Sequence, residues 1–138
     1  MSRKKYTIEC GEDEKLFPLV ASKKKLKSAY TRVFHEGILE VVNDRDLSGS
    51  DLRVFLAIIG NLGYENKFTM SITSLGELLR MQRQNVGSCI KNLVKRRYLR
   101  KEKGIGNVNF YLVDPTIAVR CRNSKYGKVI DLWDRPKY

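Results

Sequence analysis

The sequence has few of the residues from which metal centres and disulfide frameworks are built. Its 138 residues include a single histidine, His35, and three cysteines, Cys10, Cys89 and Cys121. An odd number of widely spaced cysteines predicts neither a disulfide framework nor a zinc site. We therefore expect free thiols in a reducing cytoplasm, with no metal and no cofactor.

The usual signatures of catalysis and of membrane insertion are also missing. No Gly-x-x-x-x-Gly-Lys phosphate loop is present, and no stretch approaches the ~20 consecutive apolar residues that span a bilayer. The basic start "MSRKK" is not followed by an apolar segment, and the acidic residues cluster only in "GEDE". These absences predict a cytoplasmic protein that is not an enzyme, takes no small-molecule substrate and contacts no membrane.

Positive charge, in contrast, is present in large excess. The chain has 27 lysines and arginines against 15 aspartates and glutamates, a net charge of +12. Because like charges repel and oppose compaction, an excess of this size is typical of proteins with a polyanionic partner. Nucleic acid is the first partner to consider, ahead of a membrane surface.

Composition and apolar spacing divide the chain into three parts. Residues 1–28 form a basic N-terminal arm without clear periodicity, and residues 29–122 have enough apolar positions for the core of one domain. Residues 123–138 form a C-terminal tail. We expect this tail either to contain a strand near Lys128–Leu132 or to pack loosely on the domain.

The first half of the domain predicts two helices. Apolar residues recur at helical spacing from Tyr30 to Val42 and again from Leu52 to Leu62. The second helix begins with a capping-box pair, Ser48 and Asp51, and Gly63 suits a left-handed C-terminal cap. It is so apolar that most of its circumference should be buried. A short β-leaning stretch, "NKFTMSI", follows it.

The stretch from Ser74 to Leu99 predicts two further helices around a tight turn at Met81. The second of these runs from about Gln82 to Lys95. The inner faces, defined by apolar spacing, are Leu75, Leu78 and Leu79 in the first helix, and Val86, Cys89, Ile90 and Leu93 in the second.

A β-hairpin is expected next, with strands at Tyr98–Lys103 and Val108–Val113. The connection "GIGN" has glycines that supply the positive φ of a tight turn. The order of elements is therefore helix, helix, short strand, helix, helix, hairpin. This order predicts an α+β winged helix-turn-helix, in which a three-helix core carries a β-hairpin wing.

The outer face of the predicted second helix has the chemistry of a DNA-reading surface. An arginine can donate two hydrogen bonds to guanine, and a side-chain amide can pair bidentately with adenine. Gly87 removes a side chain where the helix would approach the duplex. The residues predicted to face bases or adjacent phosphates are Arg83, Gln84, Asn85, Ser88, Lys91 and Asn92.

Other polar residues are placed to contact the DNA backbone. Between Arg80 and Lys103 nine basic residues stand against a single acid. Hydroxyls at the start of the preceding helix can donate to phosphate. The predicted backbone contacts are Thr73 and Ser74 at that helix start, Arg80, Lys95, Arg96 and Arg100 for nonspecific attraction, and Lys101, Lys103, Asn107 and Asn109 in the wing.

Two stretches resemble known families. "SLGELLRMQRQNVGSCIKNLVKRRYLRKE" resembles the recognition-helix pattern of MarR-like and other bacterial winged-helix proteins, while "DLRVFLAIIGNLGYENKFTMSITSLGELL" and "NFYLVDPTIAVR" resemble RepL-like replication initiators of small plasmids. The resemblance spans about Ala29 to Arg122 and implies origin binding and recruitment of replication proteins. Gln82 departs from the pattern's serine N-cap and Arg97 from its glycine, which leaves the helix boundaries open.

The residues leave three functions to compare. The first is a plasmid replication initiator that binds double-stranded DNA. The second is a transcriptional regulator, such as an autorepressor, with the same DNA contacts. The third is a winged helix that binds an acidic protein instead of nucleic acid. Self-association through the Tyr30–Val42 helix or the tail would suit repeated or palindromic sites.

Overall fold

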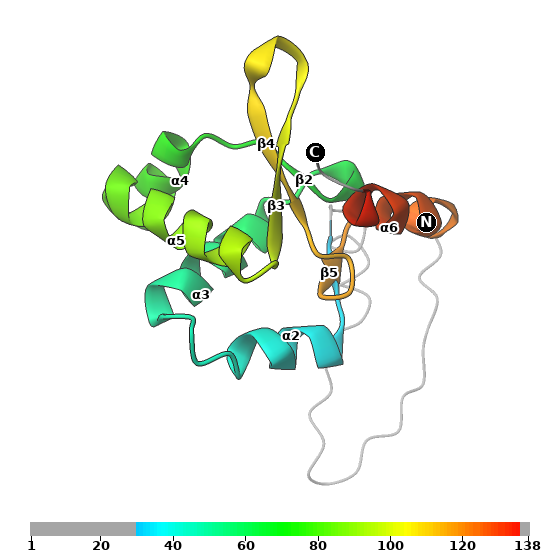
Figure 1. Cartoon of the computed structure of the whole chain (residues 1–138), viewed down its shortest axis with the longest axis horizontal. Coiled ribbons are helices and arrows are strands. Elements are labelled where there is room, and N and C mark those ends of the chain that lie inside the picture. The colour runs from blue at the N-terminus through cyan, green and yellow to red at the C-terminus, as the bar shows by residue number, and fades with distance from the viewer. Residues whose placement is uncertain (1–29, 136–138) are drawn as a thin grey trace, which may run out of the picture. The chain divides into compact units, whose positions relative to one another are not determined.

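The computed structural model describes residues 30–135, so the predicted arm at 1–28 lies outside the described residues (Figure 1). No helix in this range is long and apolar enough to cross a bilayer. In chain order the elements are β1 (Arg32–Val33), α2 (His35–Val42), α3 (Gly49–Gly60), η1 (Tyr64–Asn66), β2 (Lys67–Phe68), α4 (Ile72–Leu79), α5 (Arg83–Lys95), β3 (Leu99–Lys103), η2 (Ile105–Asn107), β4 (Asn109–Val113), β5 (Ala118–Val119), η3 (Asn123–Lys125) and α6 (Tyr126–Asp134).

Helices α3, α4 and α5 pack around one apolar core. Burying a large aliphatic or aromatic side chain stabilises a fold by about 1.5–3 kcal/mol, so these contacts fix how α5 is held. Leu75, predicted to face inward, is fully buried and anchors α4, whereas the same prediction for Leu78 is wrong because Leu78 is 57% exposed. The central buried side chains are Val54, Phe55 and Ile58 of α3, Leu75 of α4, and Val86, Ile90 and Leu93 of α5.

The predicted capping box at the start of α3 is confirmed. The Ser48 hydroxyl accepts a hydrogen bond from the Asp51 backbone N–H at 3.1 Å, and the Ser48 N–H donates to the Asp51 carboxylate at 2.9 Å. These bonds start the helix at Gly49, earlier than the apolar pattern indicates. The expected burial of most of its circumference is wrong at Leu56, which is 58% exposed.

Gly63 does not act as the left-handed cap that the sequence predicts. Its φ is −86°, and positive φ occurs instead at Glu65 and Asn66. The reason for glycine is space, because a Cβ at this position would lie 2.8 Å from the carbonyl oxygen of Lys67. The Gly63 N–H donates to that same oxygen at 2.8 Å.

The hairpin after α5 is confirmed, and it joins a third strand. The antiparallel order is β2-β4-β3, with Leu99 opposite Val113 and Lys103 opposite Asn109. Only Gly106 in the connecting turn has positive φ (71°), because Gly104 is extended. Three packed helices followed by this hairpin define the architecture (Figure 1). The fold is a winged helix-turn-helix.

The first predicted helix begins later than expected. Residues before His35 are extended, and β1 pairs with β5, Arg32 opposite Val119. The Phe34 N–H also donates to the Ile117 carbonyl at 2.9 Å. Backbone pairing with a segment far along the chain therefore overrides the apolar spacing between Tyr30 and Phe34.

The C-terminal tail contains a helix rather than the expected strand or loose segment. Helix α6 buries Val129, which is 2% exposed, and the rings of Tyr126 and Phe34 lie 6.2 Å apart. Its apolar residues recur at Tyr126, Val129, Ile130 and Trp133, which is helical spacing that the prediction overlooked.

Gly76 lets α4 meet the turn before α5, and we expect Gly76→Ala to destabilise the protein by about 1–3 kcal/mol. An added Cβ would lie 2.9 Å from the Met81 carbonyl oxygen, a backbone atom. The turn would have to move, although the Met81 N–H is bonded to the Gly76 carbonyl. Thermal unfolding measures the effect, with Gly60→Ala, which meets nothing within 4 Å, as the control. An unchanged midpoint in Gly76→Ala would show that this contact is not tight.

Candidate nucleic-acid interface

Helix α5 has one buried face and one exposed face, as its apolar spacing predicts. It begins at Arg83, one residue after the predicted start, with Gln82 at the N-cap and no side-chain capping bond. Arg97, just after the helix, has the positive φ (65°) that glycine would adopt more readily. Val86, Cys89, Ile90 and Leu93 are all buried, which fixes the direction in which the opposite face points.

The exposed face borders a hollow of about 530 Å³ between α5 and the start of α4. Five of the residues predicted to read DNA are exposed on α5: Arg83, Gln84, Asn85, Ser88 and Lys91. The Ser88 hydroxyl donates to the Gln84 carbonyl at 3.0 Å and keeps its acceptor lone pairs. No acidic side chain lines the hollow, whose residues are Ile72, Arg83, Gln84, Gly87, Ser88 and Lys91.

The start of α4 stands at the edge of this hollow. Ser71 is the N-cap; its hydroxyl accepts from the Ser74 N–H at 3.0 Å and donates to the Ser74 hydroxyl at 2.9 Å. Thr73 and Ser74 are both exposed in the first turn, as predicted. The positive end of the helix dipole at this turn favours a nearby anion. Arg80, at the left-handed C-cap of α4, and Lys95 are exposed as well.

The register of the wing places its predicted contact residues on one face. Side chains alternate along a strand, so Lys101 and Lys103 share a face with Leu99, and Asn109 lies opposite Lys103. Leu99 is buried in the helical core, which makes this the side of the wing nearer the helices. Lys101, Lys103 and Asn109 are exposed on it; the side chain of Asn107 lies outside what the structure describes.

Arg100, predicted to attract phosphate, lies on the other face of the wing. Its Nη1 donates to the Trp133 carbonyl at 2.6 Å, and its Nε forms an ion pair with Glu102 at 2.6 Å. The side chain is 15% exposed. The prediction for Arg100 is therefore wrong, because its guanidinium joins the wing to α6.

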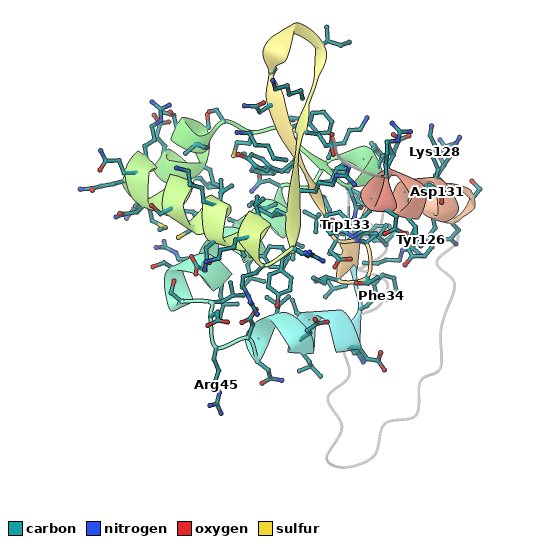
Figure 2. All side chains as sticks on the ribbon, viewed as in Figure 1. Phe34, Arg45, Tyr126, Lys128, Asp131 and Trp133 are labelled. Carbon is teal, nitrogen blue, oxygen red and sulfur yellow. The ribbon has the colours of Figure 1, made fainter. Side chains whose placement is uncertain are left out.

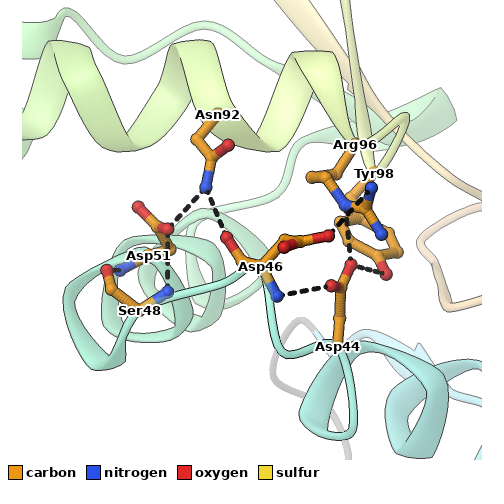
Figure 3. A network of polar contacts seen from close by, with 7 residues as sticks. All are labelled: Asp44, Asp46, Ser48, Asp51, Asn92, Arg96 and Tyr98. Atoms are coloured by element: carbon orange, nitrogen blue, oxygen red, sulfur yellow. Dashed lines mark hydrogen bonds and ion pairs between the residues drawn. The ribbon is translucent and has the colours of Figure 1, made fainter.

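Two further predicted DNA contacts belong to a polar network between α5 and the loop before α3 (Figure 3). The Asn92 amide donates to the Asp51 carboxylate at 2.7 Å and to the Asp46 carbonyl at 3.1 Å. Arg96 forms ion pairs with Asp44 at 3.0 Å and with Asp46 at 3.4 Å. The predictions for Asn92 and Arg96 are corrected accordingly, since both side chains bind the loop before α3.

The network shifts the acidity of its members. The Tyr98 hydroxyl, which donates to Asp44 at 2.6 Å, and the Arg96 guanidinium lower the pKa of Asp44. Burial and the neighbouring Asp44 raise the pKa of Tyr98 to about 12. Burial alone would raise the pKa of Asp51, but hydrogen bonds led by the Ser48 N–H and the Asn92 amide lower it below its usual value.

Asp44→Asn is expected to cost stability at neutral pH and to cost progressively less as the solution is acidified. The folded-state pKa of Asp44 is lowered, so its charge stabilises the fold above the unfolded-state pKa of about 3.9 and ceases to do so as the pH falls through the folded value. Urea unfolding of both proteins over a pH series measures the difference. A constant difference across the series would show that the carboxylate charge does not contribute.

The acids and thiols of the described residues do not assemble into a metal site. Across residues 30–135, no group of three or more His, Cys, Asp or Glu side chains could hold a metal ion. Burial and the neighbouring Asp51 raise the pKa of Cys89 to about 11, so its thiol stays protonated at neutral pH. Cys89 is buried in the core, and a protonated thiol is a poor nucleophile.

Sequence reasoning missed the acidic loop that holds α5. Asp44 and Asp46 stand in "NDRD", which reads only as a break between helices. Arg53 of α3 was also missed; its guanidinium donates to the Leu79 carbonyl at 2.7 Å and so holds the end of α4. Two aspartates close together in a strongly basic chain were the available signal.

No protein-family model and no curated protein matches this chain. Among solved structures it is similar to the adhesin competence repressor AdcR from Streptococcus pyogenes, with 13% sequence identity and a TM-score of 0.40. The match covers 85% of this chain and 71% of that one.

Proposed function

We propose that this protein binds double-stranded DNA in a sequence-dependent way and catalyses no reaction. The observation that carries the proposal is the exposed face of α5, where Arg83, Gln84, Ser88 and Lys91 line a hollow that has no acidic side chain in its lining, and where Asn85 is also exposed. A helix of this kind fits the major groove, which admits an α-helix and displays a distinct hydrogen-bonding pattern for every base pair.

The helix supplies both kinds of contact that readout requires. The amides of Gln84 and Asn85 can each donate to and accept from adenine, while Arg83 can donate twice to guanine. Lys91, about two turns further along, is placed for a phosphate or a guanine edge. Gly87 leaves the middle of this face without a side chain, which allows the backbone to approach the duplex.

The start of α4 and the wing would fix the position of α5 on the duplex. The hydroxyls of Thr73 and Ser74 can donate to phosphate, and Lys101, Lys103 and Asn109 can contact the backbone beside the groove. Such contacts carry no sequence information, but they supply most of the affinity and its dependence on salt.

Binding of labelled duplexes at increasing salt tests this function. We expect one duplex sequence to bind far more tightly than unrelated duplexes, and the logarithm of the binding constant to fall steeply with the logarithm of salt, by ~0.9 per phosphate contact. Heparin serves as a polyanion without bases. Equal, weak binding to heparin and to every duplex would overturn the proposal in favour of nonspecific charge attraction.

Two biological outputs share these contacts. A transcriptional regulator needs only the DNA contacts described, whereas the replication initiator implied by the RepL-like resemblance also needs a surface for replication proteins, so the proposal extends first to regulation. Bound sites over a promoter would support a regulator, and sites within an origin would support an initiator. Because one winged helix reads few base pairs, we also propose that two copies act on repeated or palindromic sites.

A further inference from the structure

A second hollow, of about 750 Å³, lies at the base of the wing. It shares no residue with the hollow on α5. Figure 2 shows Trp133 between α6 and the base of the wing. The lining residues are Val94, Arg97, Leu99, Arg100, Asp114, Trp133 and Arg135.

The hollow has uncommitted positive charge. Within residues 30–135, the side chains of Arg97 and Arg135 make no hydrogen bond or ion pair, and both are exposed. The one carboxylate in the lining, Asp114, accepts hydrogen bonds from the backbone N–H and the hydroxyl of Thr116, at 2.9 and 2.8 Å. Two guanidiniums are therefore available for an anion, and their charge exceeds the single negative charge that Asp114 keeps.

The rest of the lining is apolar or aromatic. Trp133 and Val94 are half-buried, and the buried Leu99 also lines the hollow. An indole ring offers a flat face on which another aromatic ring can stack, and a guanidinium matches the planar geometry of a carboxylate or phosphate. Arg100 is fixed by its bond to the Trp133 carbonyl, which holds the wing strand and α6 together around the hollow.

We propose that this hollow is a binding site for a small planar aromatic anion, either an aromatic carboxylate or an aromatic phosphate monoester. The ring stacks on Trp133, and the anionic group is held by Arg97 and Arg135. The site is separate from the DNA-reading face, so its existence does not depend on the proposed function.

The chain contains a single tryptophan, Trp133, which makes its fluorescence a direct report on the hollow. We would titrate the full-length protein with phenyl phosphate and with benzoate, following Trp133 emission and, in parallel, heat by calorimetry. Benzyl alcohol supplies the ring without the charge, and inorganic phosphate supplies the charge without the ring. We expect saturable binding of at least one aromatic anion and about tenfold weaker binding of both control compounds. Tighter binding of one anion over the other identifies the preferred anionic group.

Variants separate this site from general charge attraction. Arg97→Gln and Arg135→Gln should each weaken binding of the aromatic anion about tenfold. Arg45→Gln, the matched control, should leave it unchanged, because Arg45 is exposed on the loop between α2 and α3 (Figure 2). The proposal is overturned if neither anion binds by either readout, if benzyl alcohol or inorganic phosphate binds as well, or if all three variants bind like the original protein.

Discussion

Gln84→Ala is expected to reduce discrimination between the preferred duplex and its single-base variants by ~1–3 kcal/mol, roughly 5- to 150-fold. The amide is exposed on the outer face of α5 and lines the hollow there. Its removal deletes a pair of hydrogen bonds to one base and changes no charge. The slope of binding against salt should therefore stay as it is in the original protein.

The matched variant is Lys103→Ala, at an exposed position on the helical side of the wing. We expect it to weaken binding to all duplexes alike and to make the salt slope shallower by about 0.9, since one phosphate contact is lost. The two variants together separate base contacts from backbone contacts. Identical behaviour of the two variants would contradict the assignment of base contacts to α5 and of backbone contacts to the wing.

Gly87→Ala should have opposite effects on stability and on DNA binding. A Cβ at Gly87 meets nothing within 4 Å, so alanine fits, and its higher helix propensity should raise stability by up to ~1 kcal/mol. The same methyl group would lie beside the hollow that we propose the duplex enters. We expect duplex affinity to fall about tenfold or more, measured alongside the thermal midpoint.

Gly127→Ala provides the control for this experiment. Gly127 is an exposed glycine in α6 whose added Cβ also meets nothing within 4 Å. The substitution should stabilise the helix and leave DNA affinity unchanged. Unchanged or improved affinity in Gly87→Ala would mean that the duplex does not approach α5 at this position.

Local spacing was enough to predict the elements that carry the candidate interface. The inner face of α5 is set by Val86, Ile90 and Leu93, and that choice fixes the outer face by geometry alone. The hairpin could also be predicted, because its glycine-containing turn and its two strand patterns are adjacent in the sequence. In each case the residues that determine the structure are close in sequence, within a few turns of one helix or within two adjacent strands.

The failures concern side chains whose partners are distant in sequence. Asn92 and Arg96 have the same local chemistry as the exposed residues of α5, but Asp51 and Asp44 meet them from 41 and 52 positions away. Arg100 is likewise bound by the Trp133 carbonyl, 33 positions away. A pattern of charges cannot distinguish a guanidinium that is free to meet phosphate from one that is already paired within the fold.

Backbone pairing and packing explain the remaining differences. β1 forms because β5 is available to pair with it, although the spacing from Tyr30 favours a helix. Leu78 has the period of an inward residue, but the buried side of α4 is the side of Leu75 and Gly76, from which Leu78 points away. The formation of β1 and the exposure of Leu78 both depend on which distant parts of the chain pack against these residues.

Selection of duplexes from a random pool by the full-length protein tests the central claim most directly. If α5 reads base edges, the bound fraction should converge on one short sequence, and repeating the selection with Gln84→Ala should relax it at one position. Bound duplexes that remain random in sequence, under salt conditions where binding is tight, would contradict the claim and leave only attraction to phosphate.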